Sequence, residues 1–446
     1  MLFRKADPSC AVFRVIPGTS TNTINRHGVA RFLVAAFLAD MPGSLFANGL
    51  RVVSQDALAT ARGEAFAATA DNPSAIYYNP AGITQVSGWQ SRSGLYGVYF
   101  NSTFEPTSGA PNAGKTYDLE NNLAAIPQFF ATYSPENSPL TYGFGIYSPY
   151  GGRVIWPQDT GFRTVAIEGS VTYVTLHPVI AWELGPKLSL GAGVTVNYAK
   201  VDIEQGLLRK QNPFANRFQF VGDGWMVGYN AGVLWRPIET LSFGAAFRST
   251  TTLKADGHTE FQQQPIIPLT ELAAQSDYKF PLGVVLGVSY RPTPEWNFEF
   301  NADYTDWTSF GTTTIHQETP PPFPIQQDIT VKLGWQASWL YEFGVTRYLK
   351  DGWQVSAGYV FSENSVPDTY YSPVAADLDR HVFSFGAGHA GPRFGWDVAY
   401  QFAYGPPRVV SGSTPSAQPA QFAGQTADGT YEFISHALLI SGSIRF

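Results

Sequence analysis

Residues 109–116, Gly-Ala-Pro-Asn-Ala-Gly-Lys-Thr, match the phosphate-binding pattern of two glycines separated by four residues and followed by lysine and threonine. A working phosphate loop needs a buried parallel strand before it and a helix after it, because backbone amides and the helix N-terminus then meet the phosphates. Here a hairpin-type strand is expected before the pattern, and residues 117–121 lead into another strand. We therefore interpret 109–116 as a surface loop and predict no nucleotide site.

Other residue types that catalyse reactions or bind metals do not form a recognisable constellation. Glu299 and Asp303 lie four residues apart on the same face of a predicted strand and could in principle pair in catalysis. A solvated lining of an interior is the simpler interpretation. No Gly-x-Ser-x-Gly elbow is present, and Cys10 is the one cysteine. No two histidines have the i, i+4 spacing of a metal site; they are His27, His177, His258, His316, His381, His389 and His436. We predict no enzyme activity, no metal and no cofactor.

The composition points to a membrane protein built from strands. Of 446 residues, 44% are hydrophobic and 15% aromatic, and only 14% are charged, compared with about 25% in a typical soluble domain. No apolar run reaches the roughly 18–20 residues that a spanning helix needs. The membrane architecture that remains is a closed β-barrel. A large soluble all-β protein is the alternative that composition does not exclude.

The first 47 residues are predicted to be a signal peptide, with an N-terminus longer than usual. Five basic residues precede or enter a short apolar core at 32–39, and Ala47 is a plausible last residue before cleavage. Removal takes away five positive and two negative charges, which changes the formal net charge from −7 to −10. This balance argues against nucleic acid as a partner. Cys10 leaves with the segment, so the mature chain has no thiol for disulfides, metal binding or catalysis.

From residue 88 to the end the chain alternates apolar and polar residues in segments of about ten. The clearest segment is 295–307, where Trp296, Phe298 and Phe300 alternate with Asn297 and Glu299. Side chains alternate across a strand, so one face suits lipid and the other a wet interior. Fourteen such segments can be placed, and short and long connections alternate between them. The prediction is an all-β fold: a 14-stranded antiparallel transmembrane β-barrel over 88–446.

The two ends of the mature chain carry separate signals. Residues 48–87 do not alternate, are rich in alanine, and contain the breakers Asn72-Pro73 and Asn79-Pro80. We predict that they form a small helical hatch that plugs the barrel lumen. The last strand ends on Phe446 with apolar residues at alternate positions before it, which is typical of the signal read by the barrel-assembly machinery.

Residues 70–84, Ala-Asp-Asn-Pro-Ser-Ala-Ile-Tyr-Tyr-Asn-Pro-Ala-Gly-Ile-Thr, resemble the hatch signature of the FadL/OMPP1/TodX family of outer-membrane long-chain fatty acid transporters. The core of that signature is Asn79, Pro80 and Ala81. Three further stretches agree in order: 143–151, then 304–307 with Phe310, then 377–380 after Val366-Pro367. Ala376 departs from the pattern, since relatives often have proline before the acidic pair.

The resemblance implies that the Asn-Pro-Ala turn packs against an inward kink in the third strand. Here the kink would include Tyr147, Ser148, Pro149, Gly151 and Gly152. Independently of the family, a proline cannot donate to a strand ladder, so pairing should fail at 148–152. A gap in a barrel wall beside lipid is a plausible sideways exit for an apolar ligand.

In the family, ligand is first captured between the third and fourth long loops, which here are predicted at 204–223 and 254–279. Apolar residues there either bind ligand or bury one another, and 268–276 is predicted as a short helix. The capture candidates are Phe214, Phe218, Phe220, Phe261, Ile266, Leu269 and Leu272. Candidate partners for a ligand carboxylate are Arg153, Arg163 and Arg380, although Arg380 could instead pair with Asp377 or Asp379.

These observations predict a monomeric channel in the outer membrane of a Gram-negative bacterium, in contact with outer-membrane lipid. It would take up hydrophobic small molecules passively, with long-chain fatty acids as the first choice, through loop capture, hatch gating and lateral release. A channel of the same family for aromatic hydrocarbons is the alternative, distinguished by whether the pocket holds a cation. An outer-membrane hydrolase is a more remote one.

Overall fold

The computed structural model describes residues 49–110, 112–207, 216–263, 267–321, 326–375, 377–414 and 425–446. The predicted signal peptide, 1–47, lies outside the described residues. Within these ranges no helix is long and apolar enough to cross a membrane.

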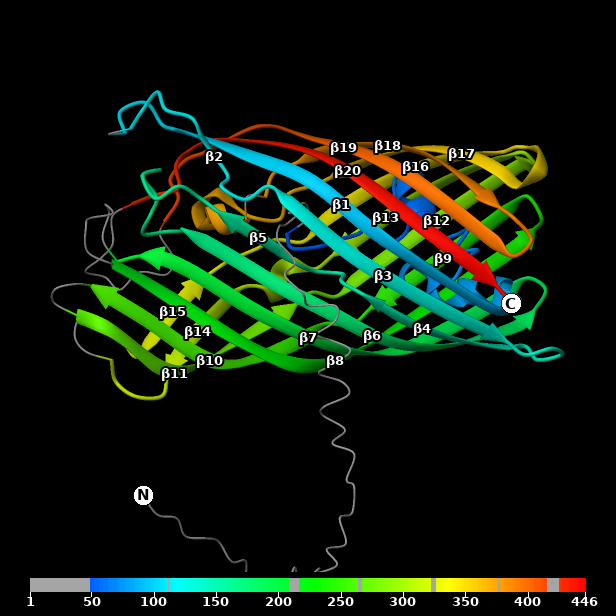
Figure 1. Cartoon of the computed structure of the whole chain (residues 1–446), viewed down its shortest axis with the longest axis horizontal. Coiled ribbons are helices and arrows are strands. Elements are labelled where there is room, and N and C mark those ends of the chain that lie inside the picture. Colours follow the sequence, from blue (N-terminus) through cyan, green and yellow to red (C-terminus); the bar gives the residue numbers. More distant parts are fainter. Residues whose placement is uncertain are drawn as a thin grey trace, which may run out of the picture. The chain divides into compact units, whose positions relative to one another are not determined.

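The described strands form one antiparallel sheet that closes on itself (Figure 1). Each strand pairs with the next along the chain, and β1 pairs with β20 over its whole length, from Gln90↔Arg445 to Pro106↔Gly429. The result is the predicted closed barrel of fourteen antiparallel strands. Closure leaves the sheet without a free edge, as a membrane requires.

Nine barrel strands are continuous and five are interrupted. The continuous strands are β1 (Gly88–Pro106), β3 (Leu123–Ser134), β6 (Glu168–Gly185), β7 (Leu188–Gly206), β8 (Asn216–Ile238), β17 (Trp353–Ser362), β18 (Arg380–Ala390), β19 (Phe394–Val410) and β20 (Gly429–Arg445). The interrupted strands are β4 (Leu140–Tyr147) with β5 (Gly152–Ile155), β9 (Leu241–Arg248) with β10 (Thr251–Gln263), β11 (Ile267–Phe280) with β12 (Gly283–Thr293), β13 (Trp296–Thr305) with β14 (Thr312–Gln317), and β15 (Asp328–Lys332) with β16 (Ser338–Tyr348). The short β2 (Tyr117–Asp118) extends a hairpin on β1.

The alternation seen in the sequence separates an apolar exterior from the lumen. On β8, Trp225, Val227 and Tyr229 point outward and are exposed, whereas Met226 and Asn230 are buried. Large apolar side chains on an outer surface are stable when lipid covers them, and aromatic residues gather at the two edges of that band.

The segment 49–87, here called the plug, lies inside the lumen in the half that contains the C-terminus (Figure 1). It holds α2 (Ala57–Ala61), α3 (Ala75–Tyr78) and the 3-10 helix η1 (Pro80–Gln85). The α2 helix begins after Asp56, whose carboxylate accepts hydrogen bonds from the backbone N–H groups of Leu58 and Ala59. Helix α2 packs on β17, β18, β19 and β20, and η1 packs on β4, β6, β7 and β8, so the plug spans the barrel interior.

Candidate ligand cavity, plug and wall gap

The barrel wall contains a gap in its hydrogen-bond ladder between β3 and the interrupted third strand. Pairing of β3 with β4 covers only residues 129–133 of β3. Strand β4 ends at Tyr147 and β5 begins at Gly152. In the described part of the chain, residues 123–128 of β3 therefore have no strand partner on this side. The prediction that pairing fails at 148–152 is confirmed, because Pro149 cannot donate to a ladder.

A short stretch of the plug, residues 50–55, covers this gap from inside; we call it the strap. The Val52 N–H donates to the Pro149 carbonyl (2.9 Å), and the Gly151 N–H donates to the Leu50 carbonyl (3.0 Å). The Gln55 side-chain amide donates to the Ser148 carbonyl (2.9 Å). The strap thus acts as a substitute strand for the broken segment. Backbone groups that would otherwise be buried without partners are satisfied in this way.

The Asn-Pro-Ala turn lies elsewhere, which corrects the expectation that it packs against the kink. The Asn79 amide donates to the carbonyls of Ala67 (2.8 Å) and Val233 (2.9 Å). A Cβ added to Gly232 would lie 2.2 Å from Asn79 Oδ1, and one added to Gly191 would lie 2.4 Å from the Ala81 nitrogen. The turn therefore packs directly on β7 and β8, where inward-facing glycines let two backbones approach closely.

The lower end of the gap, which is the end nearer the C-terminus, is held by a chain of buried polar groups; the sequence analysis placed Tyr147 in the kink but did not connect it to His177 or Asn230. The Tyr147 hydroxyl lies 2.8 Å from His177 Nδ1, and His177 Nε2 lies 2.9 Å from Asn230 Oδ1. The Tyr147 ring also makes an edge-to-face contact with Tyr77 of the plug at 5.2 Å between centroids. The last residue before the break is thereby tied both to the wall and to the plug.

Buried ion pairs hold the plug in the lower half of the barrel, by which we mean the half that contains the C-terminus (Figure 1). Arg92 of β1 is buried and binds Asp56 of the plug on one side and Asp397 of β19 on the other, the latter at 2.8 Å. Arg51 of the strap binds both carboxylate oxygens of Asp303 at 2.8 Å. Removing one partner of such a buried pair strongly destabilises the protein, because the other charge is left buried without compensation.

Glu299 and Asp303 are therefore not the solvated lumen lining that was expected; that interpretation is wrong. Both are buried, because the plug covers this face of β13. Glu299 accepts hydrogen bonds from the Ala68 N–H (2.7 Å) and the Thr69 N–H (3.1 Å), and Asp303 binds Arg51. Neither carboxylate faces open space in which a substrate could react.

A second buried carboxylate of the plug, besides Asp56, is that of Glu64. Glu64 accepts hydrogen bonds from the Ser54 hydroxyl (2.8 Å) and the Tyr78 hydroxyl (2.9 Å). Burial raises the pKa of Glu64 to about 7 despite these bonds, because the charged form loses its hydration. The plug therefore contains a group that titrates near neutral pH.

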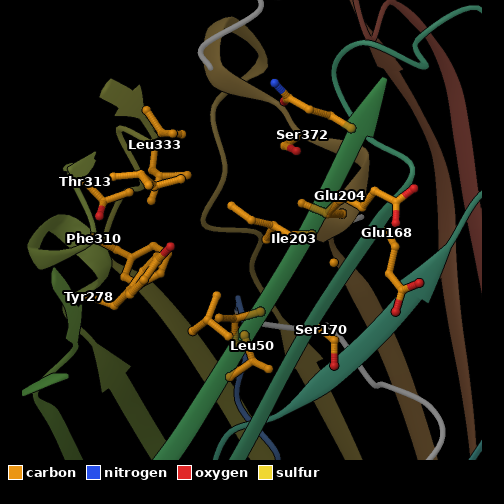
Figure 2. Close-up of a pocket in the computed structure, with 18 of the residues that line it drawn as sticks. Leu50, Glu168, Ser170, Ile203, Glu204, Tyr278, Phe310, Thr313, Leu333 and Ser372 are labelled. Atoms are coloured by element: carbon orange, nitrogen blue, oxygen red, sulfur yellow. The ribbon is translucent and has the colours of Figure 1, made fainter. Parts of the chain in front are cut away.

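Above the strap, on the side of the long loops, lies an apolar cavity of about 130 Å³ (Figure 2). Leu50 of the strap lines it, and the loop 363–379 contributes Val366, Val374 and Ala375. Residues of the barrel strands and of the segments that interrupt them complete the lining, chiefly Val171, Val201, Ile203, Phe218, Tyr278, Phe280, Phe310, Ile315, Ile329, Val331, Leu333 and Trp335. No lysine, arginine or histidine is among the described lining residues.

The acidic residues at the edge of this cavity belong to the outer side of the wall. Figure 2 shows Ile203 directed toward Tyr278 and Phe310, whereas Glu204 and Glu168 extend away from them. Alternation along a strand gives this result, since neighbouring residues face opposite sides. Glu168 pairs with Arg153 (2.7 Å). The cavity itself is therefore enclosed by uncharged groups.

The three candidate carboxylate partners are not brought together at the cavity. Arg153 lies on the outer side and binds Glu168. Arg163 lies in the loop before β6 and donates to Gln158 Oε1 (2.9 Å) and the Asn216 carbonyl (2.8 Å); burial lowers the pKa of Arg163. Arg380, the first residue of β18, is buried, with its guanidinium carbon 3.4 Å from the Phe433 ring centroid. Arg380 lines a second, smaller cavity together with Arg51 of the strap.

The predicted capture residues are in strands rather than loops, which is a second correction. Phe218 and Phe220 belong to β8, Phe261 to β10, and Leu269 and Leu272 to β11. The helix expected at 268–276 is likewise part of β11. These strands extend past the lipid band because pairing between β8, β10 and β11 continues there. Phe218 lines the cavity, Phe220 and Phe261 are buried, and Leu269 is exposed; Phe214 and Ile266 lie outside the described residues.

The phosphate-loop pattern and the possible metal ligands can be placed within the described residues. Lys115 of the phosphate-loop pattern is 62% exposed and pairs with Asp159 at 3.6 Å, and the chain continues into β2 rather than a helix. The structure thus places residues 109, 110 and 112–116 in a surface loop, as predicted. Across the described residues no three His, Cys, Asp or Glu side chains are grouped so that they could hold a metal ion.

Sequence reasoning also missed most of the cavity lining. The stretch 329–335 places Ile329, Val331, Leu333 and Trp335 on the lumen side, so here the inward positions are apolar. In 295–307 the inward positions are polar. The inward positions thus change from polar at one end of the barrel strands to apolar at the other. This change is the sequence signal that could have located the cavity.

The closed barrel, its lipid-facing exterior and its helical plug define a plugged outer-membrane β-barrel. A family model described as outer membrane protein transport protein (OMPP1/FadL/TodX) matches residues 39–438. The chain belongs to this family of outer-membrane proteins, as the resemblance of residues 70–84 predicted.

Curated relatives agree with this assignment. The chain is 24% identical over 354 residues to the long-chain fatty acid transport protein of Salmonella typhi, which covers 72% of this chain and 79% of the relative. It is 20% identical over 383 residues to outer membrane protein P1 of Haemophilus influenzae, covering 76% and 82%.

Solved structures show the same fold. A Pseudomonas aeruginosa FadL homologue superposes with a TM-score of 0.76 at 17% identity, covering 89% of this chain and 99% of that chain. The Pseudomonas putida toluene transporter TodX superposes with a TM-score of 0.63 at 13% identity, covering 91% and 100%.

Proposed function

We propose that this protein is a passive uptake channel whose ligand is an uncharged hydrophobic molecule of about the size of a single aromatic ring. The observation that carries the proposal is the apolar cavity between the strap and the loop 363–379. It is enclosed by branched and aromatic side chains, and no basic side chain is among its described lining residues. Ligand sites are usually concave and apolar, with few polar groups.

The volume of the cavity supports this choice. At about 130 Å³ it is close to an engineered cavity of about 150 Å³ lined by Leu, Ile and Phe, which stays dry and binds benzene. A chain of sixteen carbons is several times larger and would need the surrounding elements to move. The solved toluene transporters, such as TodX, are named for a ligand of the favoured size.

The charge of the lining supports it as well. Burying a carboxylate without a partner is strongly unfavourable. Arg153 faces outward, Arg163 is hydrogen-bonded to Gln158 and Asn216, and Arg380 lines a separate cavity together with strap residues 51–54. A carboxylate bound in the closed cavity would therefore lack a described cation.

Long-chain fatty acids are the second candidate, because the curated relatives with 22–24% identity are long-chain fatty acid transport proteins. In that case the carboxylate could reach Arg380 only if the strap moved aside, since Leu50 lines the apolar cavity and Arg51 lines the cavity with Arg380. The two candidates thus differ in whether Arg380 is needed for binding.

Release would occur through the gap between β3 and the third strand. The strap closes the gap with three hydrogen bonds to the broken segment, and the same strap lines the cavity through Leu50. A ligand that displaces Leu50 would also loosen these bonds. Ligand binding can open a gate only if it favours one of two plug positions over the other. The strap is the element whose movement would connect the cavity with the exit.

We further expect the protein to be a monomer, assembled into the membrane through the signal that ends at Phe446.

Binding measurements on the purified barrel in lipid nanodiscs test the ligand. Radiolabelled toluene, palmitate and methyl palmitate are compared at equilibrium, with wild type, Arg380→Gln and Arg380→Lys. Saturable toluene binding that Arg380→Gln leaves unchanged supports the uncharged ligand. Palmitate binding that exceeds methyl palmitate binding, and that Arg380→Gln removes but Arg380→Lys keeps, would favour the fatty acid. Binding of none of the three would show that the cavity is not a ligand site.

A further inference from the structure

The outer face of the barrel carries an open groove across β19, β20, β1 and β3, away from the lumen. Gly97 of β1 and Ala125 of β3, which face each other in register, form its floor. Tyr99, Leu123 and Leu438 form its walls. The hollow exists because small residues occupy two adjacent outward positions between larger ones.

The groove lies at the outer-leaflet edge of the lipid band. On β1 the outward aromatic residues Trp89 and Tyr99 are 55% and 41% exposed, and Trp89 is at the end near the C-terminus. Ten residues at about 3.3 Å each, tilted by about 40°, span about 25 Å, which is the height of the apolar band of such barrels. Tyr99, and His436 paired with it in register, therefore mark the boundary on the side of the long loops.

A polar pair lies at this boundary within the groove. The Tyr400 hydroxyl is 2.7 Å from His436 Nδ1, and the His436 ring packs on Phe402 at 5.2 Å between centroids. When the tyrosine donates to Nδ1, the neutral ring carries its hydrogen on Nε2. The described residues offer no hydrogen-bond partner for Nε2. The groove thus combines an apolar channel with one N–H donor at its outer end.

We propose that this groove is a docking site for an outer-leaflet lipid, in which one acyl chain lies over Gly97 and Ala125. An ester or phosphate oxygen of the same lipid accepts a hydrogen bond from His436 Nε2. The occupant follows from position, since the groove is continuous with the lipid-covered belt and lies at headgroup depth. Association within a membrane depends on close packing and hydrogen bonds rather than on a hydrophobic driving force, and the groove supplies both.

The test uses two matched glycine variants and hexa-acyl lipid A as the defined lipid. A Cβ at Gly97 would meet only the Leu438 carbonyl, at 3.8 Å, and one at Gly442 would meet nothing within 4 Å. The Cβ of Gly97→Leu therefore has room and its side chain enters the groove, whereas Gly442→Leu adds the same side chain to the outward face of β20 outside the groove. Native mass spectrometry of the full barrel measures bound lipid A, and gel mobility without heating checks folding.

We expect Gly97→Leu to reduce bound lipid A about fivefold through lost packing contacts, and Gly442→Leu to leave it unchanged. His436→Phe keeps the ring but removes the donor, and should also cost about fivefold. Equal binding to wild type and Gly97→Leu would overturn the proposal. An equal loss in both glycine variants would also overturn it, because the whole belt rather than the groove would then bind the lipid.

Discussion

The two halves of the lumen differ in chemistry although the same strands build both. On β7 the inward residue is Asn197 in the lower half and Ile203 in the upper half. The lower half is filled by the plug, whose backbone and charged groups pair with polar wall residues such as Glu299. The upper half contains an apolar cavity. The comparison teaches that the lower half holds the plug in place, whereas the upper half contains the cavity proposed to bind ligand, with the strap between them.

The largest effect on this division should come from the Arg92 anchor. Arg92→Met leaves Asp56 and Asp397 buried without their cation, which we expect to cost about 3–5 kcal/mol. The plug should detach, so that ion conductance through planar bilayers rises and the unfolding temperature falls. Lys115→Met is the control, because its partner Asp159 is 67% exposed and such surface pairs contribute at most about 1 kcal/mol. Equal conductance in both variants would mean that the anchor does not hold the plug.

The second effect is a pH dependence that should be confined to the lower half. The pKa of Glu64 is raised by burial to about 7, from an ordinary value of 4.5. The closed plug therefore binds the proton more tightly than the open or unfolded state. Its stability is full below about pH 4.5, falls as pH rises toward 7, and the contribution is lost above that.

Between pH 4 and pH 8 the free energy that favours the closed plug should fall by about 3 kcal/mol. Conductance recorded over this range should therefore increase with pH. Glu64→Gln should reduce the pH dependence, since the amide keeps hydrogen-bonding capacity but does not titrate. A profile that is flat in wild type, or unchanged in Glu64→Gln, would contradict the assignment. Toluene affinity in the upper half should vary little over the same range.

A third effect concerns the Asn-Pro-Ala turn. Asn79→Ala removes the amide that satisfies the carbonyls of Ala67 and Val233, which should cost about 2 kcal/mol. We expect a smaller rise in conductance than for Arg92→Met, together with a lower unfolding temperature. If Asn79→Ala altered ligand affinity but not conductance, the turn would belong to the ligand site instead.

The smallest expected effect concerns ligand affinity of the cavity in the upper half. Ile203 lines the cavity, and its neighbour Asp202 faces outward and accepts a hydrogen bond from Gln219. Ile203→Ala should weaken toluene binding about tenfold, through the loss of contacts worth about 1–2 kcal/mol. Asp202→Asn should leave equilibrium binding unchanged. Similar affinities for the two variants would place the ligand outside this cavity.

The sequence was sufficient for the barrel and insufficient for the interior. Alternation as in 295–307 predicts strands, and Pro149 predicts the break, because both follow from local backbone rules. The extent of β8 and β11 beyond the membrane was missed, since it depends on pairing with distant strands. The burial of Glu299 was missed for the same reason: a polar inward residue looks alike whether it faces water or the plug.

The roles of the strap and of Arg380 could not have been read from residue types. The Asn79 motif could be singled out from the sequence, but its contact with Gly232 rather than with the kink depends on the tertiary structure. Likewise, Arg380 is separated from the apolar cavity by a strap whose position depends on backbone hydrogen bonds to Pro149 and Gly151. Main-chain bonds of this kind leave no pattern in the side-chain sequence.

The most direct test of the account is to lock the strap to the wall. The predicted mature chain has no cysteine, so Val52→Cys with Pro149→Cys introduces the only pair, at positions whose backbones are hydrogen-bonded (2.9 Å). Cells or liposomes carrying the oxidised and reduced forms are compared for toluene uptake, and the purified forms for toluene binding. The account predicts that oxidation abolishes uptake, preserves binding, and is reversed by reductant. Undiminished uptake by the oxidised form would contradict it, because ligand would then cross without strap movement.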